Sequence, residues 1–228
     1  MTARLVVQDL GRRHYGEVLD LQRGLCRQRV SGEIHEDILL LVEHEPVVTL
    51  GRGTRPGSLP VAAAEIERRG LEVFEVERGG DVTYHGPGQL VGYPIIDLRQ
   101  HREDLHWYLR RLETGLIDAL AHLGIEAETN PGLTGVWTRG RKLASIGIHV
   151  KQWVTFHGFA LNVNTDLSYF DLIVPCGIRN VVMTSVATEL GRVDESRLWE
   201  ETRQAVIDGI GHALDLEPVK TPATLISR

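Results

Sequence analysis

Apolar residues repeat at helical spacing in several segments of the chain, and this pattern predicts four helices. The clearest covers Asp104–Leu123, which begins with an aspartate suited to an N-cap and is followed by Gly124, a suitable stop. The same periodicity, in shorter or less regular form, predicts helices at 15–30, 62–69 and 194–214.

Short apolar or alternating runs predict strands between these helices. Asp37–Val42 and Leu90–Leu98 are almost continuously apolar, whereas Lys142–Val150 alternates and is expected to pair antiparallel with Thr155–Val163. Further strands are expected at 5–10, 47–50 and 71–76, and a hairpin at 130–141. These elements predict one α+β domain over residues 1–216, with a mixed, largely antiparallel sheet flanked by helices, and a flexible C-terminal tail at 217–228.

The composition of the 228 residues is ordinary for a globular chain, with 42% hydrophobic and 25% charged residues, and it excludes a disordered or fibrous protein. The net charge of −6 argues against a nucleic-acid partner. No apolar run is long enough to span a membrane or to form a secretory signal, so neither is expected. Two cysteines are too few for a disulfide framework, and we expect a cytoplasmic protein.

Glycine is more frequent than usual, with 24 residues, and it is concentrated in Arg78–Gln89 just before the predicted strand Leu90–Leu98. This segment has neither the spacing of a phosphate-binding P-loop nor that of a dinucleotide-binding fingerprint. Its many polar residues favour a loop whose backbone closely approaches an uncharged or extended ligand. A tight loop that only connects two strands is the alternative.

The thiol of Cys176 is a candidate nucleophile, because Pro175 and Gly177 favour a sharp turn at the end of an apolar segment. A thiol needs a neighbouring group that takes its proton or stabilises its anion. Lys142, one of three lysines in the chain, can do either. The alternatives are a buried inert thiol, as expected for Cys26, and a solvated lysine at a strand end. Histidines in the same regions are further candidate partners: His85, His149 and His157.

Other kinds of site find little support in the sequence. His149 and His157 can meet across the predicted turn, but no spacing provides a third metal ligand. A serine-based triad is not indicated either, because the chain has no GxSxG elbow.

Four motifs carry a resemblance to a known family. The longest is Arg78-Gly79-Gly80-Asp81-Val82-Thr83-Tyr84-His85-Gly86-Pro87-Gly88-Gln89-Leu90. The others are Gly140-x-Lys142-x-Ala144-x-Ile146-Gly147, His157-Gly158-x-Ala160-Leu161-Asn162, and Pro175-Cys176-Gly177 followed by Thr184-Ser185. In content and order they resemble the signature of the lipoyl(octanoyl) transferases, the octanoyltransferases of lipoate biosynthesis, over about residues 5–213.

This resemblance implies the fold of the biotin and lipoate ligase catalytic domain, and an ATP-independent acyl transfer without cofactor or metal. Octanoyl-acyl carrier protein would be the donor, and a thioester on Cys176, activated by Lys142, the intermediate. The acceptors would be lysines of apo lipoyl domains in 2-oxoacid dehydrogenase complexes and of the glycine cleavage H protein, in the first step of endogenous protein lipoylation. The implied acyl-binding positions are Arg78, Gly79, Gly80, Asp81, Val82, Thr83, Tyr84, His85, Ser145, Ile146, Gly147, Gly158, Phe159 and Ala160.

The implied substrates lead to two further expectations. An apolar slot should hold the eight-carbon chain, with nearby glycines leaving room for it and with these candidates to line it: Ile146, Ile148, Phe159 and Leu161. Acyl carrier proteins and lipoyl domains are typically acidic, so a local basic rim is expected on this acidic chain, drawn from Arg52, Arg55, Arg139, Arg141, Lys151 and Arg179.

Three other functions stay open at this point. An ATP-dependent lipoate or biotin ligase of the same fold also places a lysine in the comparable strand, but it needs neither Cys176 nor the His85–Gln89 sequence. A non-catalytic module that binds acyl chains or carrier proteins would not need Cys176 either. An amidotransferase acting between two lipoyl-domain proteins would use a cysteine but a different donor.

Overall fold

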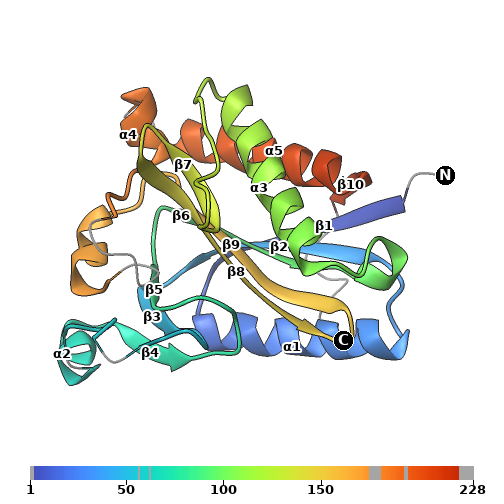
Figure 1. Cartoon of the computed structure of the whole chain (residues 1–228), viewed down its shortest axis with the longest axis horizontal. Coiled ribbons are helices and arrows are strands. Elements are labelled where there is room, and N and C mark those ends of the chain that lie inside the picture. The colour runs from blue at the N-terminus through green and yellow to red at the C-terminus, as the bar shows by residue number, and fades with distance from the viewer. Residues whose placement is uncertain (1–2, 56, 62, 175–180, 193–194, 221–228) are drawn as a thin grey trace.

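The computed structural model describes residues 3–55, 57–61, 63–174, 181–192 and 195–220. A seven-stranded sheet with the order β10-β1-β2-β6-β9-β8-β7 forms its centre (Figure 1). Its strands are β1 (Ala3–Arg13), β2 (Asp37–His44), β6 (Gln89–Ile95), β7 (Gly135–Thr138), β8 (Arg141–Lys151), β9 (Val154–Asn162) and β10 (Leu216–Lys220). β1 pairs parallel with β2 and β10, and the other pairs are antiparallel. The predicted mixed, largely antiparallel sheet is therefore confirmed.

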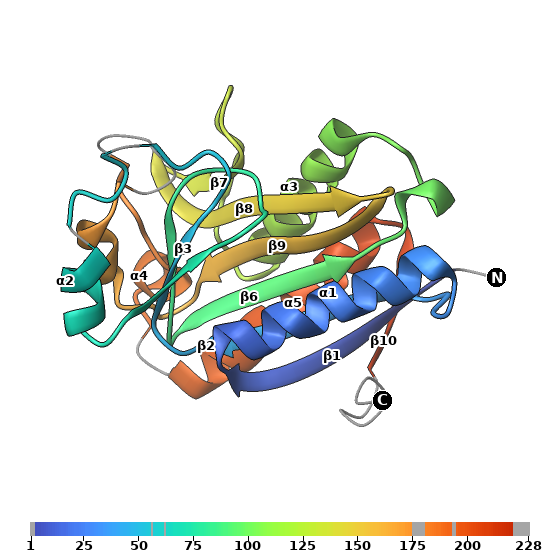
Figure 2. The same cartoon turned by 90° about the horizontal axis from the view of Figure 1, so that it is seen from below.

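Helices cover both faces of this sheet (Figures 1 and 2). α1 (Tyr15–Ser31) lies on one face against β6 and β9, and α3 (Leu105–His122) packs against α5 (Glu195–Ala213) on the other. The shorter elements are α2 (Ala63–Arg68), α4 (Val186–Leu190), and the 3₁₀ segments η1 (Leu98–Gln100) and η2 (Leu167–Leu172). Each predicted helix is confirmed to within one residue at each end. None of the helices in the described part of the chain is long and apolar enough to cross a membrane.

β2 shows why a continuous apolar run predicts a central strand. Ile38 and Leu40 pack into the core formed with α1, whereas Leu39 and Leu41 pack into the core formed with α3 and α5. Successive side chains of a strand point to opposite faces, and both faces of this one are covered. No face of this strand is exposed to solvent, so its residues do not need to alternate between apolar and polar.

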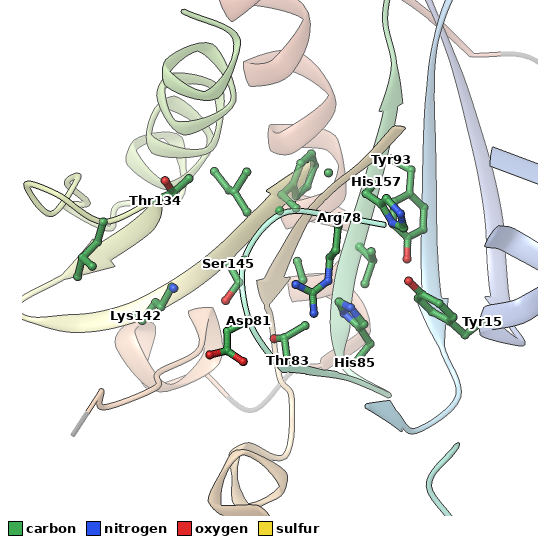
Figure 3. Close-up of a pocket in the computed structure, with 18 of the residues that line it drawn as sticks. Tyr15, Arg78, Asp81, Thr83, His85, Tyr93, Thr134, Lys142, Ser145 and His157 are labelled. Atoms are coloured by element: carbon green, nitrogen blue, oxygen red, sulfur yellow. The ribbon is translucent and has the colours of Figure 1, made fainter. Parts of the chain in front are cut away.

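A second, smaller sheet has the order β4-β3-β5 and comprises β3 (Val47–Leu50), β4 (Glu72–Glu75) and β5 (Thr83–His85). β5 continues into β6 through a tight turn in which Gln89 N donates to Gly86 O at 3.1 Å. Residues from β5, β6, β8 and β9 together surround the cavity drawn in Figure 3. The turn between β5 and β6 thus joins the two sheets at the cavity wall.

The C-terminal segment differs from the sequence prediction. Glu217–Lys220, expected in a flexible tail, belong to β10, which pairs parallel with β1 at the edge of the large sheet. The prediction is wrong for these four residues because their order comes from β1, a partner at the other end of the sequence. Pro218 also argues against a strand in the sequence pattern, although an edge strand tolerates proline. The rest of the expected tail, 221–228, lies outside the described residues.

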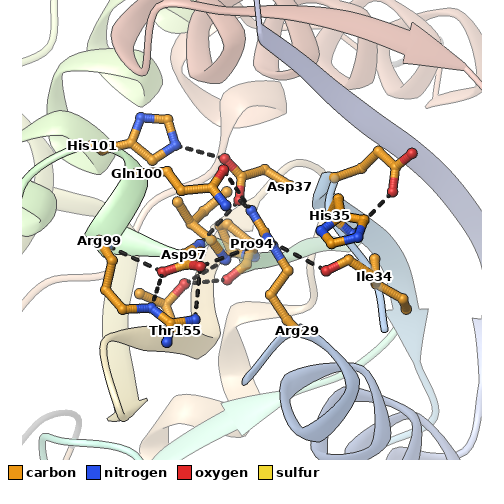
Figure 4. Close-up of polar contacts among 12 residues, drawn as sticks. Arg29, Ile34, His35, Asp37, Pro94, Asp97, Arg99, Gln100, His101 and Thr155 are labelled. Carbon is orange, nitrogen blue, oxygen red and sulfur yellow. Dashed lines mark hydrogen bonds and ion pairs between the residues drawn. The ribbon is translucent and has the colours of Figure 1, made fainter. Parts of the chain in front are cut away.

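A buried charge network holds the sheet end that is remote from the cavity (Figure 4). Arg29 of α1 donates to the Asp37 carboxylate at 3.0 Å, and both side chains are at most 4% exposed. The same carboxylate accepts from Asp97 N at 3.0 Å and lies 2.6 Å from His101 Nε2. Asp97 in turn pairs with Arg99 at 2.7 Å. The network therefore connects α1, β2 and η1 through one carboxylate.

We expect Asp37→Asn to destabilise the fold by about 1.5–3 kcal/mol, because it removes the charge of the carboxylate that hydrogen-bonds the buried Arg29 guanidinium and leaves only Asp97, at 3.7 Å, to balance it. The measurement is the free energy of unfolding in urea. Asp20→Asn is the matched control, since the Asp20 side chain is 80% exposed and its pair with Arg23 contributes little. Equal stability of the two variants would contradict the role given to the network.

Candidate active site

The structure encloses a cavity of about 220 Å³ between β5, β6, β8, β9 and the loop before β7 (Figure 3). Lys142 stands at one end, called here the lysine end, together with Thr134. Tyr15, Tyr93 and His157 stand at the opposite end, called here the inner end. Most residues expected from the resemblance line this space: Arg78, Gly80, Asp81, Thr83, His85, Lys142, Ser145, Ile146, Gly147, Gly158, Phe159 and Ala160.

Three expected residues of the glycine-rich segment do not line the cavity. Val82 and Tyr84 are buried in a separate core with Val48 of β3, because alternate side chains of this extended segment point away from Thr83 and His85. Gly79 instead donates its N–H to Ile148 O at 2.8 Å and so ties the loop to β8. Of the residues expected to form the apolar slot, Leu161 is fully buried in the main core, and Ile148 does not line the cavity.

The glycines around the cavity allow segments of the chain to lie close together. A Cβ atom on Gly147 would lie 2.8 Å from Gly79 O, and one on Gly51 would lie 2.4 Å from Gly80 O. A Cβ atom on Gly158 would lie 2.2 Å from Gly92 O. At these three positions the nearest atoms are protein backbone, so these glycines serve the close packing of the chain. A Cβ atom on Gly132, which also lines the cavity, would have no neighbour within 4 Å.

Polar side chains of the glycine-rich segment anchor it to β3 and to the preceding loop. Arg78 is 7% exposed, and its guanidinium donates to Thr49 O and Thr49 Oγ1, each at 2.8 Å. Asp81 accepts from Ser58 Oγ at 2.7 Å and from its neighbour Val82 N, also at 2.7 Å. These contacts fix the wall of the cavity opposite β8.

Lys142 is 1% exposed, which excludes the solvated strand-end lysine considered from the sequence. Its Nζ lies 4.9 Å from the centre of the Trp137 ring, so the side chain packs across β7. Its backbone N donates to Val182 O at 2.8 Å, and its O accepts from Thr184 N at 2.9 Å. Residues 182–184 therefore lie directly beside Lys142. Cys176, in the preceding segment, lies outside the described residues.

A chain of side-chain hydrogen bonds connects the cavity wall to this same segment. His85 Nδ1 lies 2.8 Å from Gln89 Oε1, and Gln89 Nε2 donates to Asn162 Oδ1 at 3.0 Å. Asn162 Nδ2 then donates to Thr184 O at 3.0 Å. The glycine-rich motif, the end of β9 and the residue beside Lys142 are thus fixed relative to one another.

Several buried polar side chains at or near the inner end are neutral. His44 Nε2 lies 2.8 Å from Tyr93 Oη, and the Tyr15 ring stacks on His85 with centroids 5.9 Å apart. Burial lowers the pKa of His44 to about 4 and that of His85 to about 3, and it raises the pKa of Tyr15 to about 12. All three groups are therefore neutral near pH 7. Sequence reasoning missed Tyr15 and Tyr93, which stand alone in a helix and a strand.

The basic rim is only partly supported by the structure. Arg52, Arg55 and Arg139 are exposed, but Arg141 pairs with Glu189 at 2.7 Å and its charge is neutralised. Lys151 is not part of a rim, because it lies four residues beyond Gly147, the last residue of β8 that lines the cavity. The sixth member, Arg179, lies outside the described residues.

No group of three histidine, cysteine, aspartate or glutamate residues in the described segments is arranged to hold a metal ion. His149 and His157 do not form such a site, and His157 instead has Glu77 Oε2 at 3.5 Å from its Nε2. Cys26, with 2% exposure, is the buried thiol that the sequence predicts.

Octanoyltransferases and lipoate protein ligases are among the known proteins that resemble this chain. An octanoyltransferase from Solibacter usitatus is 51% identical over 181 residues, 79% of this chain and 82% of that protein. An octanoyltransferase from Chloroflexus aggregans is 47% identical over 218 residues, 94% of this chain and 97% of that protein. A bipartite lipoate protein ligase from Thermoplasma acidophilum shares the fold, with a TM-score of 0.73 at 16% identity over 99% of this chain and 89% of that one.

A family model described as the lipoyl protein ligase A/B catalytic domain matches residues 14–211, a range that includes every residue lining the cavity. The relationship expected from the four motifs is confirmed by this match. The chain belongs to the lipoyl protein ligase A/B catalytic domain family.

Proposed function

We propose that this protein is an acyltransferase that moves an octanoyl group from a thioester donor to a lysine of a lipoyl domain. The observation that carries the proposal is the buried Lys142 at one end of the cavity, with its backbone hydrogen-bonded to the segment that follows Cys176. The relatives named octanoyltransferases, 51% and 47% identical, support the octanoyl group as the one transferred. Octanoyl-acyl carrier protein is the proposed donor, and 2-oxoacid dehydrogenase complexes and the glycine cleavage H protein supply the acceptors.

The proposed reaction has two displacements. The Cys176 sulfur attacks the octanoyl carbonyl, a new C–S bond forms, the donor C–S bond breaks, and the donor thiol leaves with a proton. The acceptor lysine then attacks the Cys176 thioester, an amide C–N bond forms, and the Cys176 thiol is regenerated. Lys142 receives the proton of the attacking group and returns it to the leaving sulfur. The donor is already an activated thioester, so neither ATP nor a cofactor is required.

The described neighbours of the Cys176 segment support this assignment. On one side, Val174 N donates to Ser58 O at 2.9 Å, and Ser58 Oγ donates to Asp81 of the cavity wall. On the other side, Val182 O accepts from Lys142 N. The segment is thus linked to the cavity lining at both ends, through Ser58 to Asp81 at one end and directly to Lys142 at the other.

The first prediction concerns the covalent intermediate. Incubation with octanoyl-acyl carrier protein, without ATP, should give a protein that carries one octanoyl group, detected by intact mass. Cys176→Ser should abolish the adduct, because a hydroxyl is a far weaker nucleophile than a thiolate. Cys26→Ser is the matched control and should keep it, since Cys26 is buried in α1 and burial raises the pKa of its thiol.

Addition of apo lipoyl domain should then discharge the adduct and octanoylate the domain. Strict dependence on ATP would favour a ligase instead, and binding of the donor without any adduct would favour a non-catalytic module. Discharge only with an octanoylated lipoyl domain as donor would favour an amidotransferase.

The second prediction concerns Lys142. Lys142→Met keeps an unbranched side chain in the buried position but removes the amine, and it should lower the rate of octanoyl transfer by at least about 10²-fold. Lys151→Met, at the exposed far end of the same strand, should leave the rate unchanged. Unfolding temperatures measured in parallel identify any loss due to misfolding. A transfer rate within a few-fold of wild type for Lys142→Met would contradict the proton-transfer role.

The third prediction concerns the exposed arginines near the cavity. The double change Arg52→Glu and Arg55→Glu should slow transfer from octanoyl-acyl carrier protein and reduce its dependence on salt, because an acidic donor loses electrostatic attraction. Transfer from a small octanoyl thioester should not change. Arg4→Glu with Arg27→Glu, at exposed positions outside the cavity lining, is the control. Equal rates of transfer from the carrier protein in the two double variants would show that Arg52 and Arg55 do not contribute to donor docking.

A further inference from the structure

The Lys142 side chain packs on the ring of Trp137, and both side chains are almost completely buried. Lys142 is 1% exposed and Trp137 is 2% exposed. Lys142 Nζ lies over the ring, 4.9 Å from its centre. Lysine is almost never buried to this extent unless another group stabilises its charge. The face of an indole ring is such a group, because its electron density attracts a cation within about 6 Å.

The ring owes this position to an irregularity in the pairing of β7 with β8. Val136 is paired with Ala144, so a regular antiparallel register would place Trp137 opposite Leu143. The register shifts between Val136 and Trp137, and Trp137 instead pairs with Lys142. Residues that lie directly opposite each other on antiparallel strands have their side chains on the same face of the sheet. Irregularities of this kind re-aim side chains and are frequent beside active sites.

Gly135 provides the space in which Lys142 and Trp137 meet. A Cβ atom on Gly135 would lie 3.0 Å from Lys142 Cε and 3.2 Å from Trp137 Cη2, which is closer than most Cβ contacts in proteins. Gly135 N donates to the buried carboxylate of Glu113 at 3.0 Å, which attaches this residue to α3. Trp137 N donates to Glu128 O, and Glu128 N donates to Trp137 O, each at 2.8 Å. These contacts fix β7 at the point where its ring meets the lysine.

Trp137 is separated from the cavity by the lysine itself. It is not among the described residues that line the cavity, whereas Lys142 is. Figure 3 shows Lys142 among the side chains that surround the cavity at the lysine end. A substrate in the cavity therefore meets the amine and not the indole ring. Any effect of Trp137 on the reaction has to act through Lys142.

Charged side chains on the elements around Lys142 are engaged in contacts of their own, namely Glu113 of α3 with Arg110, Glu189 of α4 with Arg141, Asp81 with Ser58, and Arg78 with Thr49. Substitution of Trp137 breaks none of these contacts. A change in the reaction that follows such a substitution therefore reports on the ring and on Lys142.

We infer that Trp137 is a positioning residue for Lys142, and that its ring stabilises the Lys142 ammonium by a cation–π interaction. The inference rests on the proposed function, in which Lys142 receives the proton of the attacking group and returns it to the leaving sulfur. The ring favours the protonated state between these two transfers, so the proton stays available to the leaving sulfur up to a higher pH. Cys176 and Lys142 exchange this proton, so the pH dependence of the reaction belongs to the pair.

Fluorinated tryptophan tests the inference at nearly constant ring shape, because ring fluorines withdraw electron density from the face that attracts the cation. The rate of octanoyl-adduct formation is measured against pH for proteins that contain ordinary, monofluorinated and trifluorinated tryptophan. The alkaline limb of the profile should move to lower pH along this series, by at least about half a pH unit in total, because a less stabilised ammonium loses its proton more readily. A limb that stays in place while the unfolding temperature is unchanged would overturn the inference.

Trp137→Phe is the matched control, because the chain contains four tryptophans and the series changes all of them. With the same fluorinated tryptophans at positions 107, 153 and 199, the limb of this variant should not move along the series. Trp137→Leu removes the ring and should lower kcat at least about fivefold, with KM for the donor within about twofold, since the ring does not line the cavity. Equal movement of the limb in Trp137→Phe would assign the effect to another tryptophan and overturn the inference.

Nuclear magnetic resonance observes Lys142 without the reaction. The chain has three lysines, so labelled lysine gives three sets of side-chain signals, and the Lys142 set is the one that Lys142→Met removes. Its titration midpoint should fall along the fluorine series, while the midpoints of the exposed Lys151 and Lys220 stay in place. A constant Lys142 midpoint would overturn the inference, whatever the rates show.

The two measurements separate this inference from the proposed function. If the Lys142 midpoint falls and the alkaline limb moves with it, both stand. If the adduct forms but neither the midpoint nor the limb moves, the role of Trp137 is wrong while the proposed function stands. If no adduct forms although the midpoint falls, the proposed function fails and the cation–π contact stands.

Discussion

The antiparallel pairing of β8 with β9 is the constraint on which the cavity depends. Its register places Gly147 opposite Gly158 and Ile148 opposite His157, so both strands contribute to the same wall. A slip of one residue would turn each side chain of β8 to the opposite face of the sheet. Lys142 would then leave the lysine end and lose its backbone bonds to residues 182–184. The position of the candidate catalytic amine is thus a consequence of strand register.

The second constraint is the close packing of the glycine-rich segment onto this pair of strands. Gly79 donates to Ile148 O, and Gly147 has no side chain that could push Gly79 away. Arg78 and Asp81 hold the same segment from its other side through Thr49 and Ser58. The distance between the glycine-rich segment and β8, which are opposite walls of the cavity, is therefore set by backbone contacts between these two segments. Glycines can thus determine the shape of a binding site by allowing the segments around it to pack closely.

Local patterns in the sequence predicted α1, α2, α3, α5 and most strands, because helix periodicity and buried strands depend on neighbouring residues, but they did not predict the short elements β5 and α4. The motifs also predicted twelve residues that line the cavity, Lys142 among them, since segments with dense polar and glycine residues rarely serve packing alone. Tyr15, Tyr93 and β10 were not predictable in this way. Each owes its position to a contact with a segment far away in the sequence, and a single tyrosine in a helix carries no sign of that contact. Val82 and Tyr84 were misplaced because the resemblance marks whole segments, whereas a strand alternates its faces.

The packing of the inner end bears on how the protein limits chain length. Each buried CH₂ group contributes roughly 0.8 kcal/mol, so an apolar slot favours longer chains until they meet a wall. Tyr15, Tyr93 and His157 form the inner end of the cavity, and each of these side chains is at most 3% exposed. Forcing an extra CH₂ group against such closely packed rings costs about 1–3 kcal/mol, which exceeds the gain from burying it. An alkyl chain is therefore limited in length by steric contact with these rings.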